Sequence, residues 1–174
     1  MDDNPDDVLF LQEATRMAGV PLSIHCTGGL TTAVDYLSKI AQVSDHQRYA
    51  GPDLALLDCN FRSNCGPNLI HWIRTHPSFK SLPIVVLVGS EAPVLISRCY
   101  EIGADHFLVK PRCQLLSRLS AIVHALHEYV ASNPSCSELL LRLPEYRPGP
   151  PRATPTPSSA PVVPWLPSNS RPPA

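Results

Sequence analysis

The run Pro83-Ile84-Val85-Val86-Leu87-Val88 is the stretch that decides the fold of this 174-residue chain. After the proline, five β-forming apolar residues follow one another with no polar residue between them. A strand that is apolar on both faces is typical of a parallel sheet covered by helices on its two sides. The run therefore predicts a buried strand of an α/β sheet.

On both sides of this run, short apolar stretches alternate with stretches of helical spacing. We expect further strands over 22–26, 54–57 and 106–109, and helices over 5–18, 30–43, 67–75, 91–102 and 115–130. This alternation predicts right-handed crossovers and a doubly wound parallel sheet. Ligands of such sheets bind at the carboxyl ends of the strands. That edge holds Asp58, Val88 to Ser90, and Lys110.

The last part of the chain has a different composition. Eleven of the 20 prolines lie between Pro144 and Pro173, with few large apolar residues among them. Such a segment buries too little surface to offset its ordering entropy. We predict a domain over residues 1–131 and a proline-rich, disordered tail over 132–174. An inert tail and a polyproline docking ligand with Trp165 as its anchor both remain open.

Charge and cysteine usage exclude several classes of protein. The formal net charge of −1 gives no basic field for nucleic acid or anionic membranes, and no apolar run has the roughly 20 residues that cross a bilayer. Six cysteines without CxxC spacing fit reduced thiols in a cytoplasmic protein. A hydrolytic enzyme is a weak alternative, because the chain has neither a GxSxG elbow nor a P-loop.

Three acidic side chains and a lysine converge on the predicted strand ends. Asp2 and Asp3 precede the first helix, Asp58 follows the strand 54–57, and Lys110 follows the strand 106–109. Carboxylates are oxygen ligands of the kind that Mg²⁺ prefers. A carboxylate held beside a metal and a lysine can attack a phosphoryl group, whose charge the two cations then offset.

With these features the chain resembles the receiver domain of two-component response regulators, over about residues 2–131. The resembling motifs are Asp2-Asp3-Asn4-Pro5-Asp6-Asp7, Pro52-Asp53-Leu54-Ala55-Leu56-Leu57-Asp58-Cys59-Asn60, Pro83-Ile84-Val85-Val86-Leu87, Gly103-Ala104-Asp105 and Lys110-Pro111. The opening motif and the long loop over 42–51 look like the small single-domain regulators that partner phytochrome-type kinases. The resemblance implies the flavodoxin-like receiver fold.

The resemblance also implies a role for each matching residue. Asp58 matches the phosphoacceptor, and Lys110 matches the lysine that pairs with the phosphoryl group. Asp3 matches the direct Mg²⁺ ligand, Asp2 its water-mediated partner, and Asn60 the residue whose backbone carbonyl binds the metal. The implied protein accepts a phosphoryl group from a sensor histidine kinase and is not a turnover enzyme. It would signal through protein contacts, with a homodimer left open and its downstream partner unknown.

Two further positions match the family, and one departs from it. Phe107 falls at the aromatic switch position, and Pro111 implies a cis peptide after Lys110. Val88 stands where the family usually has Thr or Ser, whose hydroxyl donates to the phosphoryl oxygen. Loss of one hydrogen bond to a charged group costs about 1.5–3 kcal/mol. The alternative function is therefore a pseudo-receiver, a protein-binding module that no longer switches by phosphorylation.

The second departure lies at the amino terminus. The family begins with an apolar strand before the acidic pair, whereas only Met1 precedes Asp2 here. That strand would lie at the sheet centre, between the strands over 22–26 and 54–57, in the order 2-1-3-4-5. We expect the first strand to be missing or truncated, so that either the chain as given folds poorly or, as we favour, the given start lies downstream of the real one.

Overall fold

A computed structural model describes residues 1–42, 51–58, 65–89, 93–112, 114–132, 140 and 142–147. The helices are α1 (Pro5–Ala18), α2 (Leu30–Gln42), α3 (Cys65–Thr75), α4 (Pro93–Ile102) and α5 (Leu115–Ala131), and the strands are β1 (Ala55–Asp58), β2 (Ile84–Val88) and β3 (His106–Val109). These strands form one parallel sheet in the order β1-β2-β3. The predicted parallel α/β architecture is confirmed.

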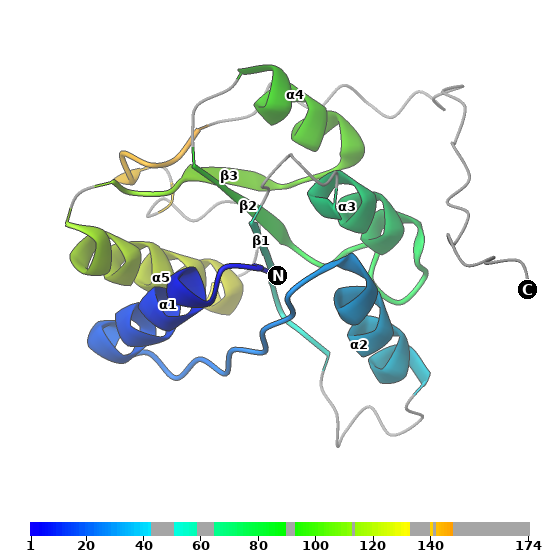
Figure 1. The fold of residues 1–174 in the computed structure, drawn as a ribbon, viewed down its shortest axis with the longest axis horizontal. Coiled ribbons are helices and arrows are strands. Elements are labelled where there is room, and N and C mark those ends of the chain that lie inside the picture. The colour runs from blue at the N-terminus through cyan, green and yellow to red at the C-terminus, as the bar shows by residue number, and fades with distance from the viewer. Residues whose placement is uncertain are drawn as a thin grey trace, which may run out of the picture.

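The apolar run after Pro83 forms the middle strand, β2, and all five of its residues are buried. Helices cover both faces of the sheet (Figure 1). Ile84, Val86 and Val88 join a core cluster with residues of α2, α3 and α4. Val85 and Leu87 join a second cluster with residues of α1 and α5. The alternation of a strand therefore divides the core into two layers.

Local signals in the sequence explain where two of the helices begin or end. The Asn4 side chain accepts a hydrogen bond from the Asp6 N–H and so caps α1, which ends at Gly19 with φ 66°. Gly103 follows α4 with φ 118°, and a Cβ at this position would lie 2.9 Å from the Arg74 side chain. Glycine therefore suits both positions, since its backbone adopts positive φ at little cost.

The strand predicted over residues 22–26 does not form, and this prediction was wrong. Residues 20–27 have no regular structure, although the segment runs beside β1. Strands need a hydrogen-bonding partner, and among the described residues Met1 and Asp2 are the ones whose backbone bonds to the two segments. The Met1 amino group donates to the Leu56 carbonyl at 2.8 Å, and the Asp2 N–H donates to the Thr27 carbonyl at 3.0 Å.

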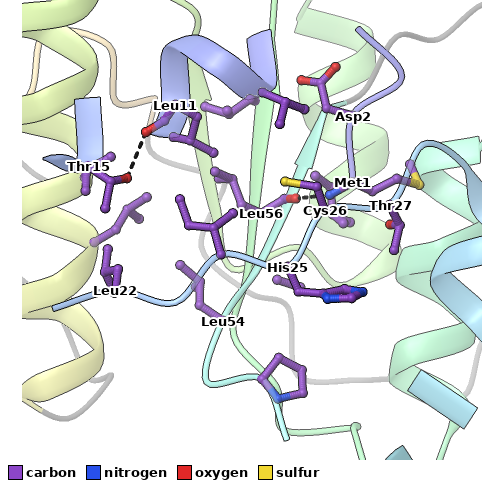
Figure 2. A pocket seen from close by; sticks show the side chains of 18 of the residues that line it. Met1, Asp2, Leu11, Thr15, Leu22, His25, Cys26, Thr27, Leu54 and Leu56 are labelled. Carbon is purple, nitrogen blue, oxygen red and sulfur yellow. Dashed lines mark hydrogen bonds between the residues drawn. The ribbon is translucent and has the colours of Figure 1, made fainter. Parts of the chain in front are cut away.

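A cavity of about 510 Å³ lies where the central strand was expected. Its lining is mostly apolar and comes from α1, α5, β1 and residues 22–27 (Figure 2). The cavity is lined by Leu54 and Leu56 and by Leu22 to Cys26. Only the end of that strand position is filled, by Met1 and Asp2.

Part of the predicted tail packs against the body. Leu140 is buried in the α1–α5 layer, and Tyr146 bridges Leu108 of β3 in the antiparallel sense. The domain boundary at residue 131 stays a prediction, and the proline-rich segment from residue 148 lies outside the described residues. None of the helices that the described residues form is both long and apolar enough to cross a membrane.

Candidate functional site at the carboxyl edge of the sheet

The candidate site lies where β1 and β3 end. Asp58 is the last residue of β1, and Lys110 comes directly after β3. Because the strands are parallel, with β2 between them, both residues reach the same edge of the sheet. The Lys110 N–H donates to the Val88 carbonyl at 2.7 Å, which extends the pairing of β2 and β3 by one residue. The fold therefore brings Asp58 and Lys110 together, as the sequence predicted.

The acidic pair reaches this edge because the backbone beside it is tied to its neighbours. The Asp58 N–H donates to the Met1 carbonyl at 2.9 Å, and the Asp2 N–H donates to the Thr27 carbonyl. An Asp2 carboxylate oxygen accepts a hydrogen bond from the Asn4 N–H at 3.0 Å. These bonds fix the turn from the sheet edge into α1 and so orient the Asp2 carboxylate.

The Lys110 ammonium contacts three carboxylates. Its Nζ lies 3.1 Å from Asp58 Oδ1, 3.3 Å from Asp2 Oδ2 and 2.6 Å from Asp7 Oδ2. The Asp58 side chain is 10% exposed and that of Lys110 is 22% exposed, so these charges are screened less than surface charges. With Asp3, which lies near Asp2 and Asp58, the site holds four carboxylates and one lysine and is strongly acidic.

Burial and neighbouring charge act in opposite directions on the two central groups. Burial raises the pKa of the Asp58 carboxyl above its ordinary value, and the Lys110 ammonium offsets part of that rise. Burial alone would lower the pKa of Lys110, but its contacts with Asp7 and Asp58 outweigh this and raise that pKa. Lys110 therefore stays charged beside the carboxylates.

Three of the predicted metal-binding residues lie close enough to share one ion. Asp2, Asp3 and Asp58 each place a carboxylate oxygen within 4.8 Å of the other two. Oxygen donors and a net negative charge are the ligand set that Mg²⁺ takes, usually with several waters retained. The donor set thus fits the predicted ion. Asn60 lies outside the described residues, so its role stays a prediction.

Sequence reasoning missed the contact between Asp7 and Lys110. The sequence by itself indicates for Asp7 only a first-turn helix charge, a role that the helix dipole favours. The start of α1 instead lies over the sheet edge, and the Asp7 carboxylate lies 2.6 Å from the Lys110 ammonium. The density of acidic residues from Asp2 to Asp7 was the one signal that could have pointed to this contact.

The remaining predicted positions lie around the same edge. Val88 ends β2 and is 3% exposed, and Phe107 is fully buried beside the Tyr100 ring at 6.3 Å. The cis peptide expected before Pro111 was wrong, because the described backbone contains none. Trans is the more stable form of an X–Pro bond by about 0.5–1 kcal/mol, so no special geometry is needed there.

Comparison with known proteins agrees with this fold. The family model described as "Response regulator receiver domain" matches residues 2–120, and the chain therefore belongs to the response regulator receiver family. It is a member of the class of modules found in two-component signalling systems.

Individual relatives resemble the chain over part of their length. The Arabidopsis thaliana two-component response regulator-like protein APRR3 is 27% identical over 99 residues, which are 57% of this chain and 20% of that protein. The Oryza sativa (subsp. japonica) response regulator ORR1 is 27% identical over 114 residues, which are 64% of this chain and 47% of that protein. The chain thus spans less than half the length of these relatives.

Solved structures of receivers have the same fold. The phosphorylated cyanobacterial phytochrome response regulator RcpA has a TM-score of 0.62 and 29% identity, covering 76% of this chain and 91% of that chain. The Mn²⁺-bound response regulator Rcp1 has a TM-score of 0.59 and 22% identity, covering 74% of this chain and 88% of that chain. The flavodoxin-like receiver fold is thereby confirmed.

Proposed function

We propose that this receiver accepts a phosphoryl group on Asp58 from the phosphohistidine of a sensor histidine kinase. The single observation that carries the proposal is the cluster at the sheet edge. Asp2, Asp3 and Asp58 hold carboxylate oxygens within 4.8 Å of one another, with the Lys110 ammonium 3.1 Å from Asp58. A phosphoacceptor needs a carboxylate together with cations that offset phosphoryl charge, and this site offers both.

In this step an Asp58 oxygen attacks phosphorus, a P–O bond forms, and the P–N bond to the histidine breaks. The imidazole nitrogen leaves with the bonding electron pair and takes up a proton. Mg²⁺, when bound, would offset negative charge on the transferring oxygens. Asp2, Asp3, Asp58 and Asn60 are the residues we assign to hold it. Lys110 pairs with the phosphoryl group, so Asp58 and Lys110 are the reacting pair.

Likeness to RcpA, described as a phytochrome response regulator, supports a phytochrome-like kinase as the partner. The bacteriophytochrome response regulator AtBRR, with a TM-score of 0.52 and 28% identity over 63% of this chain and 78% of that chain, supports the same partner. We propose a cytoplasmic phosphoprotein that signals through protein contacts and turns over no substrate.

The first prediction concerns the adduct itself. Incubation with Mg²⁺ and acetyl phosphate should give an acid-stable, base-labile phosphoryl adduct on the wild-type chain and none on Asp58→Asn, measured by intact-protein mass spectrometry. Asp53→Asn is the matched control, because Asp53 is an exposed aspartate near the opposite end of β1. It should keep the adduct. A folded wild-type chain without any adduct would contradict the proposal and favour the pseudo-receiver.

The buried apolar side chain of Val88 is the observation that favours the pseudo-receiver. A threonine there could donate to a phosphoryl oxygen, and such a bond is worth about 1.5–3 kcal/mol. We therefore predict that Val88→Thr increases the effect of phosphorylation on hydrogen exchange over residues 106–109 by about tenfold or more.

Val86→Thr controls for this change, since Val86 lies in the same core layer as Val88, two residues further from the strand end. It buries a hydroxyl at a comparable cost without placing it at the sheet edge. An equal response in both variants would mean that the hydroxyl acts through core packing and not through the phosphoryl group.

A further inference from the structure

Residues 140 and 142–147, which we call the strap, lie along the edge of β3 that β2 does not use (Figure 1, orange). The Val109 N–H donates to the Glu145 carbonyl at 2.9 Å, and the Arg147 N–H donates to the Phe107 carbonyl at 3.0 Å. These two bonds flank the antiparallel bridge between Leu108 and Tyr146. The strap therefore pairs with β3 in the manner of a short edge strand.

Side chains attach the strap to the helices on both sides of β3. The Glu145 side chain is 8% exposed, and its carboxylate lies 2.8 Å from the Arg118 guanidinium of α5. Leu140 is 1% exposed among the apolar residues of α1 and α5. On the other side, the Tyr100 hydroxyl of α4 donates to the Arg147 carbonyl at 2.7 Å. The strap thus crosses the face formed by α4, β3 and α5.

The strap covers groups that suit an extended peptide. Without it, the Phe107 carbonyl and the Val109 N–H would lose these backbone hydrogen bonds, and the Arg118 guanidinium would lose a carboxylate. An edge strand with free N–H and C=O groups is a template for another strand. The groups that the strap contacts define the chemistry of a replacement: an extended segment with an acidic residue for Arg118 and a leucine for the apolar site of Leu140.

We propose that the strap is an intramolecular cover, which must leave β3 before an acidic, leucine-containing peptide of a partner protein can pair with that edge. Its described contacts include a short ladder, one ion pair, the hydrogen bond from Tyr100 and one buried leucine, whereas β2 is buried from end to end. Segments with few contacts open at lower free energy than the core does. This proposal concerns a surface away from Asp58 and stands whether or not Asp58 accepts a phosphoryl group.

The first experiment measures opening in the wild-type chain by hydrogen exchange. The amides of Val109 and Arg147 should exchange together, at least tenfold faster than the amides of Val86 and Leu87 in β2. Exchange of all four at one rate would show that the strap leaves only when the domain unfolds, and would overturn the proposal. No variant is needed, so a failure to fold cannot obscure the result.

The second experiment measures competition by a fluorescent peptide with the sequence of residues 140–147. We expect the full chain carrying Glu145→Gln and Arg147→Pro to bind it at least tenfold more tightly than the wild-type chain does, because its own strap has lost the ion pair and one backbone donor. The same peptide with glutamine in place of its glutamate should bind at least tenfold more weakly. Thermal unfolding verifies that the variant is folded.

Glu101→Gln is the matched control, because it makes the same chemical change at an exposed position of α4. It should bind the peptide as the wild-type chain does. Equal peptide affinity in the wild-type chain and the strap variant would overturn the proposal, as would binding that does not depend on the peptide's glutamate.

Discussion

An apolar, strand-forming segment of about five residues joined to the amino group of Met1 should raise the melting temperature of this chain by about 10 °C or more. The segment would continue the parallel pairing that Met1 begins. The Met1 amino group donates to the Leu56 carbonyl, and the Asp58 N–H donates to the Met1 carbonyl. This is the bonding pattern of a residue in a parallel strand beside β1.

The space for this segment is the cavity of about 510 Å³ in Figure 2. Successive residues of a strand direct their peptide groups to opposite edges, and Ala55 and Leu57 pair with β2. The N–H and C=O groups of Leu54 and the N–H of Leu56 therefore face the cavity. A strand placed there would pair with them and with residues 22–26 on its other side.

The expected increase in melting temperature follows from two opposing contributions to the free energy of folding. Burial of five apolar side chains stabilises the fold by about 12 kcal/mol, at ~2.4 kcal/mol each. Ordering five residues costs about 7 kcal/mol at ~1.5 kcal/mol each. The remainder of about 5 kcal/mol corresponds to roughly 10–20 °C for a chain of this size.

A segment of equal length in which alternate residues are proline is the matched control. Its apolar area is similar, but it lacks the N–H donors that pairing with the segment around Leu54 requires. Differential scanning calorimetry should show the increase in melting temperature for the first segment only. An equal increase for both would mean that apolar burial alone accounts for the gain and that no strand forms.

The sequence was sufficient to predict the three strands that pair in the structure. Each is apolar enough to be identified without knowledge of its neighbours, and β2 needed no other signal than its five consecutive apolar residues. Residues 22–26 are different, because a half-apolar segment becomes a strand only when a partner satisfies its peptide groups. It does not form a strand because no neighbouring strand pairs with it, and not because of its own residues.

The candidate site was predictable where it depends on the chain's topology. Asp58 and Lys110 follow strands, and parallel strands bring such residues to one edge. The contact of Asp7 with Lys110 depends instead on the angle at which α1 leaves the sheet, which no local pattern specifies. The strap was missed for another reason: its leucine, glutamate and tyrosine lie at the start of a proline-rich segment, and composition dominated the interpretation.

Lys110→Met should strengthen Mg²⁺ binding by about tenfold or more, yet slow phosphoryl incorporation by about 100-fold. The ammonium lies within 3.3 Å of oxygens of Asp2, Asp7 and Asp58, so it competes with a divalent cation for the same carboxylates. Two opposite unit charges at ~4 Å interact by about 1–4 kcal/mol across the dielectric range of a half-buried site. Without the ammonium, these carboxylates attract Mg²⁺ without competition, so the ion binds more tightly.

The loss of transfer has a separate cause. The phosphoryl group brings negative charge into a site that already holds several carboxylates, and in the variant only the metal would offset it. Removal of one group that stabilises transition-state charge typically costs 10²–10³ in rate. Mg²⁺ affinity is measured by isothermal titration calorimetry without any phosphodonor, and incorporation is measured with acetyl phosphate at saturating Mg²⁺.

Because Mg²⁺ affinity and phosphoryl incorporation change in opposite directions, the prediction tests the positive charge of Lys110 specifically. Lys39→Met removes an exposed lysine of α2 and should change neither quantity. If Lys110 served only to hold the edge together, the variant would lose Mg²⁺ affinity and phosphoryl incorporation in parallel, because the carboxylates would no longer be oriented. A higher Mg²⁺ affinity together with slower phosphoryl incorporation requires instead two effects of the ammonium. It competes with the metal for the carboxylates before transfer, and it stabilises the phosphoryl charge during transfer.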